Sequence, residues 1–208
     1  MNSANTIRAL FLDVGGVLLT DGWNHESRKL AAETFNLDLK EMEDRHHSTF
    51  DTYEVGKLSL EKYLNRIVFY RKRSFTQADF RKYMFAQSKM LPNMIEFVCQ
   101  LKAQHHLKIA VVSNEGRELT EHRIKEFHLN EFVDFFISSC FVHLRKPDTD
   151  IYGLALDVSQ VPASQVVYVE DRALFVQVAQ GLGIHAIHHT DFESTRSRLS
   201  EFGLGNDI

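Results

Sequence analysis

The chain has 208 residues, 44% of them hydrophobic, so it is long enough for one domain with a sizeable core, alone or with an insertion. Its formal net charge is −4 and no basic stripe occurs, so binding to nucleic acid through the phosphates is not expected. With only two cysteines, neither a disulfide framework nor a CxxC metal site is expected.

The sequence carries no signal for export or membrane insertion. Its first residues lack the charged start, the long apolar core and the small-residue cleavage site of a signal peptide. No stretch approaches the ~18–20 apolar residues that cross a bilayer. We therefore expect a cytoplasmic protein without a membrane partner.

The first predicted element is a buried β-strand over residues 7–14, IRALFLDV. It is an apolar run rather than an alternation, which is typical of a parallel sheet covered on both faces. The run ends in a carboxylate, Asp13, and Gly15 and Gly16 follow. Because glycines let the backbone turn sharply and approach a ligand closely, this strand end is a candidate site.

Residues 20–88 differ in composition from the rest of the chain. They are rich in Glu, Lys, Arg, Phe and Tyr, and they contain no convincing strand. Amphipathic patterns predict helices near 26–36, 40–53, 59–70 and 76–88. We expect an all-helical insertion directly after the first strand.

Strands and helices alternate through the remainder of the chain. The further strands are predicted at 108–113, 132–139, 165–170 and 185–190. Helical patterns precede or separate them, and Gly183 ends the last of these helices. This alternation predicts a doubly wound, Rossmann-like α/β fold with a parallel sheet. The predicted core comprises residues 1–19 and 89–208, and the insertion comprises residues 20–88.

Polar residues stand at the ends of the predicted strands. They are Asp13, Ser113 and Asn114, Lys146 in the loop after the third strand, and Glu170 and Asp171. Ligands of open parallel sheets bind outside the carboxyl ends of the strands. Clustered carboxylates repel one another unless a cation lies among them, and oxygen ligands favour a hard ion such as Mg²⁺. A lysine adds a fixed positive charge that suits a phosphate.

At these positions the sequence resembles the haloacid dehalogenase superfamily. The four motifs, in the family's order and spacing, are Asp13-Val14-Gly15-Gly16-Val17-Leu18, Ser113-Asn114, Lys146-Pro147 and Glu170-Asp171. Residues 20–88 are similar to the family's small helical cap and are called the cap below. The resemblance covers essentially the whole chain. It is greatest to the small capped phosphatases whose first motif reads Asp-x-Gly-Gly or Asp-x-Gly-Asn.

The resemblance implies a Mg²⁺-dependent hydrolase in which Asp13 is the nucleophile and forms an aspartyl-phosphate. The implied metal ligands are Asp13, the backbone carbonyl of Gly15, Asp171 and, through water, Glu170. Ser113 would hydrogen-bond the phosphoryl group, and Lys146 would pair with Asp13 and with the phosphoryl oxygens. The expected substrate-binding residues are Ser113, Asn114, Lys146, His25 and Trp23.

Two residues depart from the family pattern. Phosphatases of the family usually carry an aspartate two residues after the nucleophile, where it moves a proton, and this chain has Gly15. A positioned acid–base group contributes about 10²–10⁴-fold in rate. A residue such as His25 or Glu115 could stand in, the substrate could have a good leaving group, or the activity could be largely lost. Phe175 stands where many relatives have Asp or Asn supporting the metal.

The 11 histidines do not form a predicted metal site. The adjacent pairs His46-His47, His105-His106 and His188-His189 point apart on a helix or strand, so they do not make the i, i+4 pair of a zinc site. His25 is different, because it follows the first motif and enters the cap.

The sequence supports three functions. The main hypothesis is phosphatase action on a small phosphorylated metabolite, sugar phosphates included, by a monomer or homodimer. The second is a metal-independent 2-haloacid dehalogenase, since such enzymes also lack an aspartate at the position of Gly15. The third is a phosphometabolite-binding pseudoenzyme, for which Gly15 and Phe175 are the arguments.

Overall fold

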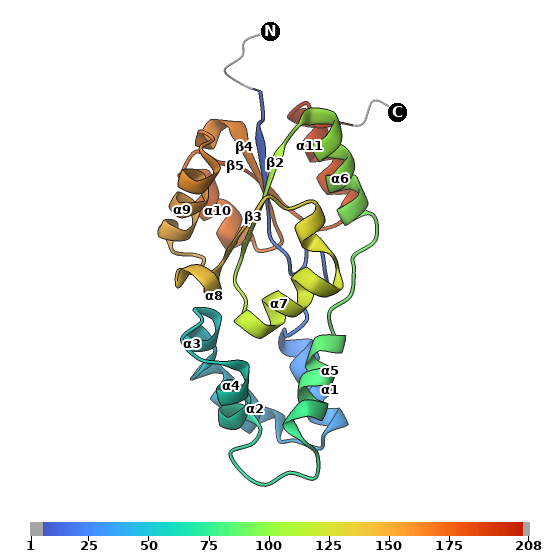
Figure 1. Cartoon of the computed structure of the whole chain (residues 1–208), viewed down its shortest axis with the longest axis vertical. Helices are drawn as coiled ribbons and strands as arrows, with labels where there is room; N and C mark the ends of the chain where they lie inside the picture. The colour runs from blue at the N-terminus through green and yellow to red at the C-terminus, as the bar shows by residue number, and fades with distance from the viewer. Residues whose placement is uncertain (1–5, 206–208) are drawn as a thin grey trace.

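The computed structural model describes residues 6–205. Its core is a five-stranded parallel sheet with the order β3-β2-β1-β4-β5 (Figure 1). The strands are β1 (Ala9–Leu12), β2 (Lys108–Ser113), β3 (Phe135–Ser138), β4 (Val166–Glu170) and β5 (His185–His188). The predicted α/β class is confirmed. The carboxyl ends of the parallel strands form one edge of the sheet, called the carboxyl edge below. Because β1 lies in the centre of the sheet, the residue after it, Asp13, lies in the middle of this edge.

Helices cover both faces of this sheet, as the doubly wound prediction requires (Figure 1). On one face lie α6 (Met94–His105), α7 (Arg117–Glu126) and α11 (Phe192–Glu201), and on the other α9 (Thr149–Ser159) and α10 (Ala173–Gly181). Alternate residues of a strand point to opposite faces. Leu10 and Leu12 therefore pack with the first group, and Ala9 and Phe11 with the second. Burial on both faces explains why the strands read as continuous apolar runs.

Five helices form between β1 and α6. They are α1 (His25–Thr34), α2 (Leu39–His47), α3 (Phe50–Glu54), α4 (Leu60–Ile67) and α5 (Gln77–Ala86). They share a hydrophobic cluster of their own, in which aromatic side chains such as Tyr63 and Phe80 are fully buried. Figure 1 shows these helices beneath the carboxyl edge of the sheet, at one end of an elongated molecule.

The single helix predicted near residues 40–53 is two helices in the structure. The break falls at Ser48 and Thr49, whose hydroxyls donate to backbone carbonyls of the preceding turn, at Asp44 and Arg45 respectively. Such local bonds compete with continuation of the helix. The periodicity alone did not reveal this break, because apolar residues continue in register across it.

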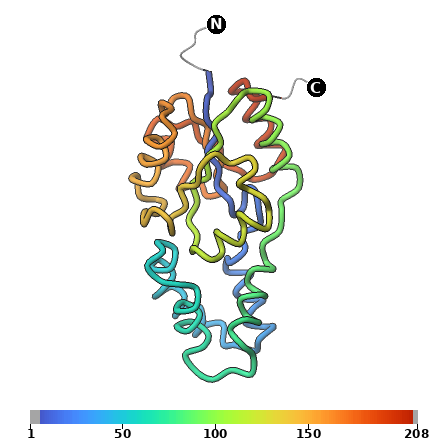
Figure 2. The backbone as a smooth tube through the Cα atoms, viewed as in Figure 1, coloured from blue at the N-terminus to red at the C-terminus, as the bar shows by residue number. Residues whose placement is uncertain are grey.

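The two chain segments that join the cap to the core lie side by side (Figure 2). Leu19 and Met90 form an antiparallel bridge, and the backbone N–H of Thr20 donates to the carbonyl of Lys89 at 2.8 Å. Arg123 of α7 contacts both segments, donating to the Thr20 carbonyl and to the Ser88 hydroxyl at 3.0 Å each. The linkers are thus fixed to each other and to the core.

Among residues 6–205, no helix combines the length and the hydrophobicity that crossing a membrane requires. Three further short helical segments connect the larger elements. They are α8 (Ser139–Val142), η2 (Leu129–Glu131) and η3 (Ala163–Gln165). Of these, α8 matters for the site, because it faces α3 of the cap (Figure 1).

Candidate active site

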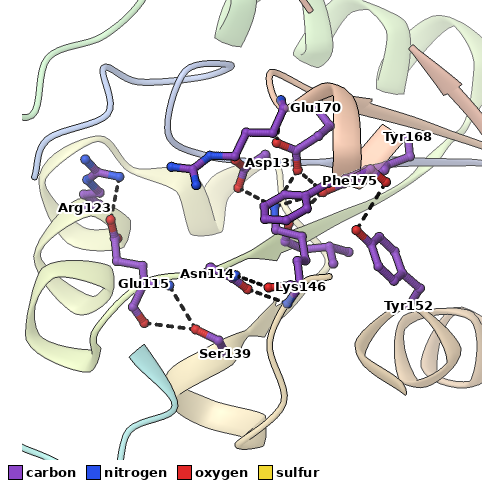
Figure 3. Close-up of polar contacts among 12 residues, drawn as sticks. Asp13, Asn114, Glu115, Arg123, Ser139, Lys146, Tyr152, Tyr168, Glu170 and Phe175 are labelled. Atoms are coloured by element: carbon purple, nitrogen blue, oxygen red, sulfur yellow. Dashed lines mark hydrogen bonds and ion pairs between the residues drawn. The ribbon is translucent and has the colours of Figure 1, made fainter. Parts of the chain in front are cut away.

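The polar residues at the strand ends converge on one edge of the sheet (Figure 3). Asp13 follows β1, Ser113 ends β2 and Glu170 ends β4, while Lys146 comes from the loop between α8 and α9. All four are buried, with at most 8% of each residue exposed. The three strands end at the same edge because Leu12 of β1 pairs with Val111 of β2 and with Val169 of β4.

Lys146 is the centre of the polar contacts. Its Nζ lies 3.1 Å from Asp13 Oδ1 and 2.6 Å from Glu170 Oε2, and it donates to the Tyr168 hydroxyl at 3.0 Å. That hydroxyl in turn donates to the carboxylate of Glu170. Burial alone would lower the pKa of Lys146, but the charges of Asp13 and Glu170 outweigh it and raise that pKa. The lysine is therefore a fixed ammonium ion.

The backbone of Lys146 is held by Asn114. The Asn114 side chain donates to the Lys146 carbonyl and accepts from the Lys146 N–H, both at 2.8 Å. Sequence reasoning assigned Asn114 to substrate binding, and the structure gives its amide this contact with the lysine loop. Two hydrogen bonds from one side chain fix the loop relative to the end of β2, which positions the ammonium group beside Asp13.

Tyr168 is a site residue that sequence reasoning did not identify. It precedes Glu170 by two residues on β4, so both side chains point to the same face of the sheet. Its hydroxyl orients Lys146 and Glu170 at once. A tyrosine two residues before the acidic motif in an otherwise apolar strand was the available signal.

Three carboxylates gather at this edge. Asp13, Glu170 and Asp171 each offer an oxygen, and these oxygens all lie within 4.8 Å of one another. Burial raises the pKa of all three carboxyl groups. The charge of Lys146 opposes this rise at Asp13 and Glu170, and a hydrogen bond with Glu170 opposes it at Asp171. Asp171 Oδ1 is buried without a hydrogen-bond partner among the described residues, and Asp13 Oδ1 is buried with the ion pair to Lys146 as its polar contact. This donor set fits a hard divalent cation, which would supply the missing positive charge.

The two glycines of the first motif have different surroundings. Gly16 has a φ of +75°, and a Cβ there would collide with the Asp171 carboxylate, so this position requires glycine. Gly15 has no such backbone requirement. A Cβ at Gly15 would lie 2.8 Å from Asp21 Oδ1 and 3.8 Å from Arg123 Nη1.

A cavity of about 330 Å³ lies between this edge and the cap. Asp13, Ser113, Asn114 and Lys146 line it from the core side, and Asp21, Trp23 and His25 line it from the entry to the cap. Trp23 is nearly buried, and its indole N–H donates to the Tyr63 hydroxyl at 2.9 Å. The His25 side chain is 58% exposed, and its Nδ1 lies 3.6 Å from Glu43 Oε2.

Phe175 also lines the cavity. It is the third residue of α10, is only 8% exposed, and its ring centre lies 5.1 Å from Lys146 Nζ. An aromatic ring thus contacts the lysine at a position where the family resemblance led us to expect Asp or Asn. A cation–π contact of this kind favours the charged form of the lysine.

Glu115 and Arg123 form a buried ion pair beside the cavity, with Oε1 and Nη1 2.6 Å apart. Burial raises the pKa of Glu115 to about 7, against the opposing charge of Arg123. The Glu115 N–H donates to the Ser139 hydroxyl at 3.0 Å, and that hydroxyl donates to the Glu54 carbonyl of α3 at 2.7 Å (Figure 3 shows Ser139 beside Glu115). Arg123 and Ser139 were not predicted, because each also contacts a residue distant in sequence, Thr20 and Glu54 respectively.

In two of the three adjacent histidine pairs, one side chain is buried and the other is exposed. His46 is buried while His47 is exposed, and His189 is buried while His188 is exposed. Within residues 6–205, only the Asp13, Glu170 and Asp171 group brings three candidate metal ligands together.

Comparison with known proteins gives one family and several relatives. The family model for haloacid dehalogenase-like hydrolases matches residues 20–188. A phosphorylated carbohydrates phosphatase of Thermotoga maritima is 24% identical over 194 residues, covering 88% of this chain and 84% of the relative. A sesquiterpene phosphatase of Aspergillus oryzae is 25% identical over 202 residues, covering 94% and 96%.

Solved structures show the same fold. A HAD family enzyme of Bacteroides thetaiotaomicron superposes with a TM-score of 0.76 at 16% identity, covering 88% of this chain and 93% of that one. A magnesium complex of the same enzyme gives a TM-score of 0.75. An L-2-haloacid dehalogenase gives 0.64 at 18% identity, covering 87% and 85%.

Proposed function

Because the chain belongs to the haloacid dehalogenase-like hydrolases and is an enzyme of that family, we propose that it is a Mg²⁺-dependent phosphatase of small phosphorylated metabolites. In this proposal Asp13 is the nucleophile and forms an aspartyl-phosphate. The observation that carries the proposal is the gathering of three buried carboxylates around one lysine at the carboxyl edge of the sheet. The two phosphatase relatives, which align over most of the chain, support it.

The cluster suits a phosphate ester better than an uncharged substrate. Asp13, Asp171 and the backbone carbonyl of Gly15 would hold Mg²⁺, with Glu170 contributing through water. The bound ion would offset the repulsion between carboxylates and phosphate and the charge of the transition state. Lys146, which lies beside Asp13, would then offer its positive charge to the phosphoryl oxygens.

Each side chain then has a definite task. Asp13 attacks phosphorus, and Lys146 pairs with the Asp13 carboxylate and with the phosphoryl group. Ser113, which hydrogen-bonds Asp13, is placed at the end of β2 to donate to a phosphoryl oxygen. Asn114 positions Lys146 through its backbone. Burial of the whole group excludes water and strengthens these electrostatic contacts.

The cavity between core and cap supports a small-molecule substrate. Its volume of about 330 Å³ is at the lower end of ligand pockets. Trp23 and His25 at the entry to the cap are the proposed contacts for the part of the substrate beyond the phosphate. The Thermotoga maritima relative, a phosphatase of phosphorylated carbohydrates, supports sugar phosphates as the first class to test.

A panel of sugar, alkyl and aryl phosphates, assayed with Mg²⁺ and with EDTA, tests the proposal. Phosphate release should require Mg²⁺ and should fall by at least 10⁴-fold in Asp13→Asn, because the nucleophile is lost. Asp157→Asn, an exposed aspartate of α9, is the matched control and should keep wild-type activity.

Two other outcomes would contradict the proposal. Halide release from 2-haloacids in EDTA, without phosphatase activity, would assign the second candidate function. Thermal stabilisation by phosphate esters with no turnover across the panel would make the chain a binding protein.

A further inference from the structure

A carboxylate from elsewhere in the chain lies where the side chain of position 15 would begin. An ideal Cβ at Gly15 would stand 2.8 Å from Asp21 Oδ1 and 3.6 Å from Asp21 Cα. Asp21 lines the same cavity as Asp13 and Gly15. The glycine therefore leaves a space in the first motif that Asp21 fills from six residues further along.

The backbone holds Asp21 in this place. The N–H of Gly16 donates to the Leu19 carbonyl at 2.7 Å, which closes the turn after the first motif. Thr20, the residue before Asp21, is hydrogen-bonded to Lys89 and to the buried guanidinium of Arg123. The N–H of Trp23 donates to the Asp21 carbonyl on the other side.

The Asp21 carboxylate itself has no hydrogen-bond or ion-pair partner among the described residues. It is partly exposed to the cavity. Burial raises the pKa of Asp171, and the charges of Asp13 and Asp21 contribute further. Asp13 and Asp21 thus both lie within electrostatic reach of Asp171.

The other acid–base groups near Gly15 are bound to partners. The Glu115 carboxylate is paired with Arg123 at 2.6 Å and accepts from Thr120. His25 is largely exposed and lies beside Glu43. Asp21 Oδ1 is the atom nearest to the Cβ position of Gly15, and no atom of Glu115 or His25 is among the three nearest.

We propose that Asp21 is the catalytic acid–base residue of this enzyme, in place of the side chain that Gly15 lacks; the proposal rests on the phosphatase function proposed above. In the first step an Asp13 oxygen bonds to phosphorus, the bond from phosphorus to the leaving oxygen breaks, and that oxygen takes the proton of Asp21. In the second, a water oxygen attacks phosphorus and Asp21 takes the water's proton. The Asp13–phosphorus bond breaks, phosphate leaves, and both carboxyl groups return to their starting states.

The test compares leaving groups in wild type and Asp21→Asn. For alkyl and sugar phosphates, whose leaving oxygen must be protonated, kcat/KM should fall by about 10²–10⁴-fold. For 4-nitrophenyl phosphate, whose leaving group departs without a proton, kcat/KM should fall less than about tenfold, because kcat/KM reports only the steps up to its departure. A merely structural role would lower both equally.

Glu26→Gln is the matched control, since Glu26 is an exposed carboxylate at the same entry to the cap and does not line the cavity. This variant should leave kcat/KM unchanged for both substrate classes. A second measurement looks for a gain of function: Gly15→Asp should not raise kcat/KM for alkyl phosphates by more than about tenfold, because a carboxylate already serves that position and a Cβ there would crowd Asp21 Oδ1 at 2.8 Å.

The outcomes separate the two proposals. A wild-type enzyme that releases no phosphate overturns both. An active wild type with equal losses for the two substrate classes in Asp21→Asn, or with a gain of 100-fold or more in Gly15→Asp, overturns the role of Asp21 alone. A loss confined to the poor leaving groups supports it.

Discussion

At the scale of single residues, Lys146 carries the electrostatic balance of the site. It is 1% exposed and is the one lysine in contact with the carboxylates of Asp13 and Glu170 among the described residues. A buried charge that loses its partner is costly, about 3–5 kcal/mol. The site therefore depends on this ammonium group for folding as well as for its chemistry.

Lys146→Met should lower the free energy of unfolding at pH 7 by about 3–5 kcal/mol in EDTA. The loss should shrink at pH 5, because burial raises the pKa of Asp13 and Glu170 and the unpaired carboxylates take up protons as the pH falls. Urea unfolding at the two pH values measures both effects.

Lys102→Met is the control for this prediction. Lys102 also pairs with a carboxylate at 2.7 Å, that of Asp134, but both side chains are about one third exposed. Exposed pairs contribute about 0–1 kcal/mol. An equal loss in the two variants, or no difference between pH 7 and pH 5 for Lys146→Met, would contradict the prediction.

At the scale of elements, α2 and α4 of the cap are joined through a buried histidine. His46 Nδ1 lies 2.6 Å from the Tyr63 hydroxyl, which accepts from Trp23, so the tyrosine proton points to a neutral imidazole. Burial, and next the charge of Arg28, lowers the pKa of His46 to about 3. The charge of Glu43 raises the pKa of His46, and the charge of His47 lowers it.

This pKa predicts acid sensitivity of the cap. Since the folded pKa of about 3 lies below the ordinary value of 6.5, the stabilisation is complete above pH 6.5 and is lost as the pH falls towards 3. The slope approaches 1.4 kcal/mol per pH unit, or about 2 kcal/mol between pH 6.5 and pH 5. His46→Gln should lose that much less stability than wild type between pH 7 and pH 5, measured by urea unfolding.

His47→Gln serves as the control. His47 is the neighbour of His46 on α2, but its side chain is 73% exposed. This variant should keep the wild-type pH dependence. If His46→Gln also keeps it, another group causes the acid sensitivity.

At the scale of the whole molecule, the cap is attached to the core on two sides of the cavity. On one side are the paired linkers and Arg123. On the other, Arg145 of the core pairs with Asp51 at 2.7 Å and with Glu54 at 2.5 Å, both on α3. The first contact is continuous with the chain, whereas the second is held only by contacts between residues distant in sequence.

Arg145→Gln should loosen the second contact. Glu54 is 5% exposed, and burial raises its pKa against the opposing charge of Arg145. In the variant, Glu54 loses a charged hydrogen bond that contributes about 1.5–3 kcal/mol. Hydrogen exchange at the backbone amides of α3 should become about tenfold faster or more. Arg71→Gln, which breaks an ion pair with Glu41 inside the cap, should leave exchange in α3 unchanged. Unchanged exchange in Arg145→Gln would show that other contacts hold α3 in place.

The sequence predicted the parts of this molecule that follow from local pattern. The strands are apolar runs, and Asp13, Ser113 and Glu170 stand at their ends, so the fold and the carboxyl edge were predictable. The positions of Arg123 and Asp21 were not predictable. Arg123 contacts Thr20, 103 residues away, and Asp21 comes near Gly15 only through the turn between them, and neither contact produces a periodic pattern. The break between α2 and α3 also depends on hydroxyl contacts that hydrophobic periodicity does not register.

The meeting of Leu19 and Met90 has a consequence for how such an enzyme changes over evolutionary time. The chain leaves the core and returns to it at neighbouring points, so the length of the segment inserted between them has little effect on the fold of the core. Doubling the length of a flexible loop adds only about 0.6 kcal/mol in closure entropy. A different module can be inserted between these two residues while Asp13 and Lys146 stay in place, so new specificity is open to the enzyme without rebuilding the edge of the sheet that holds them.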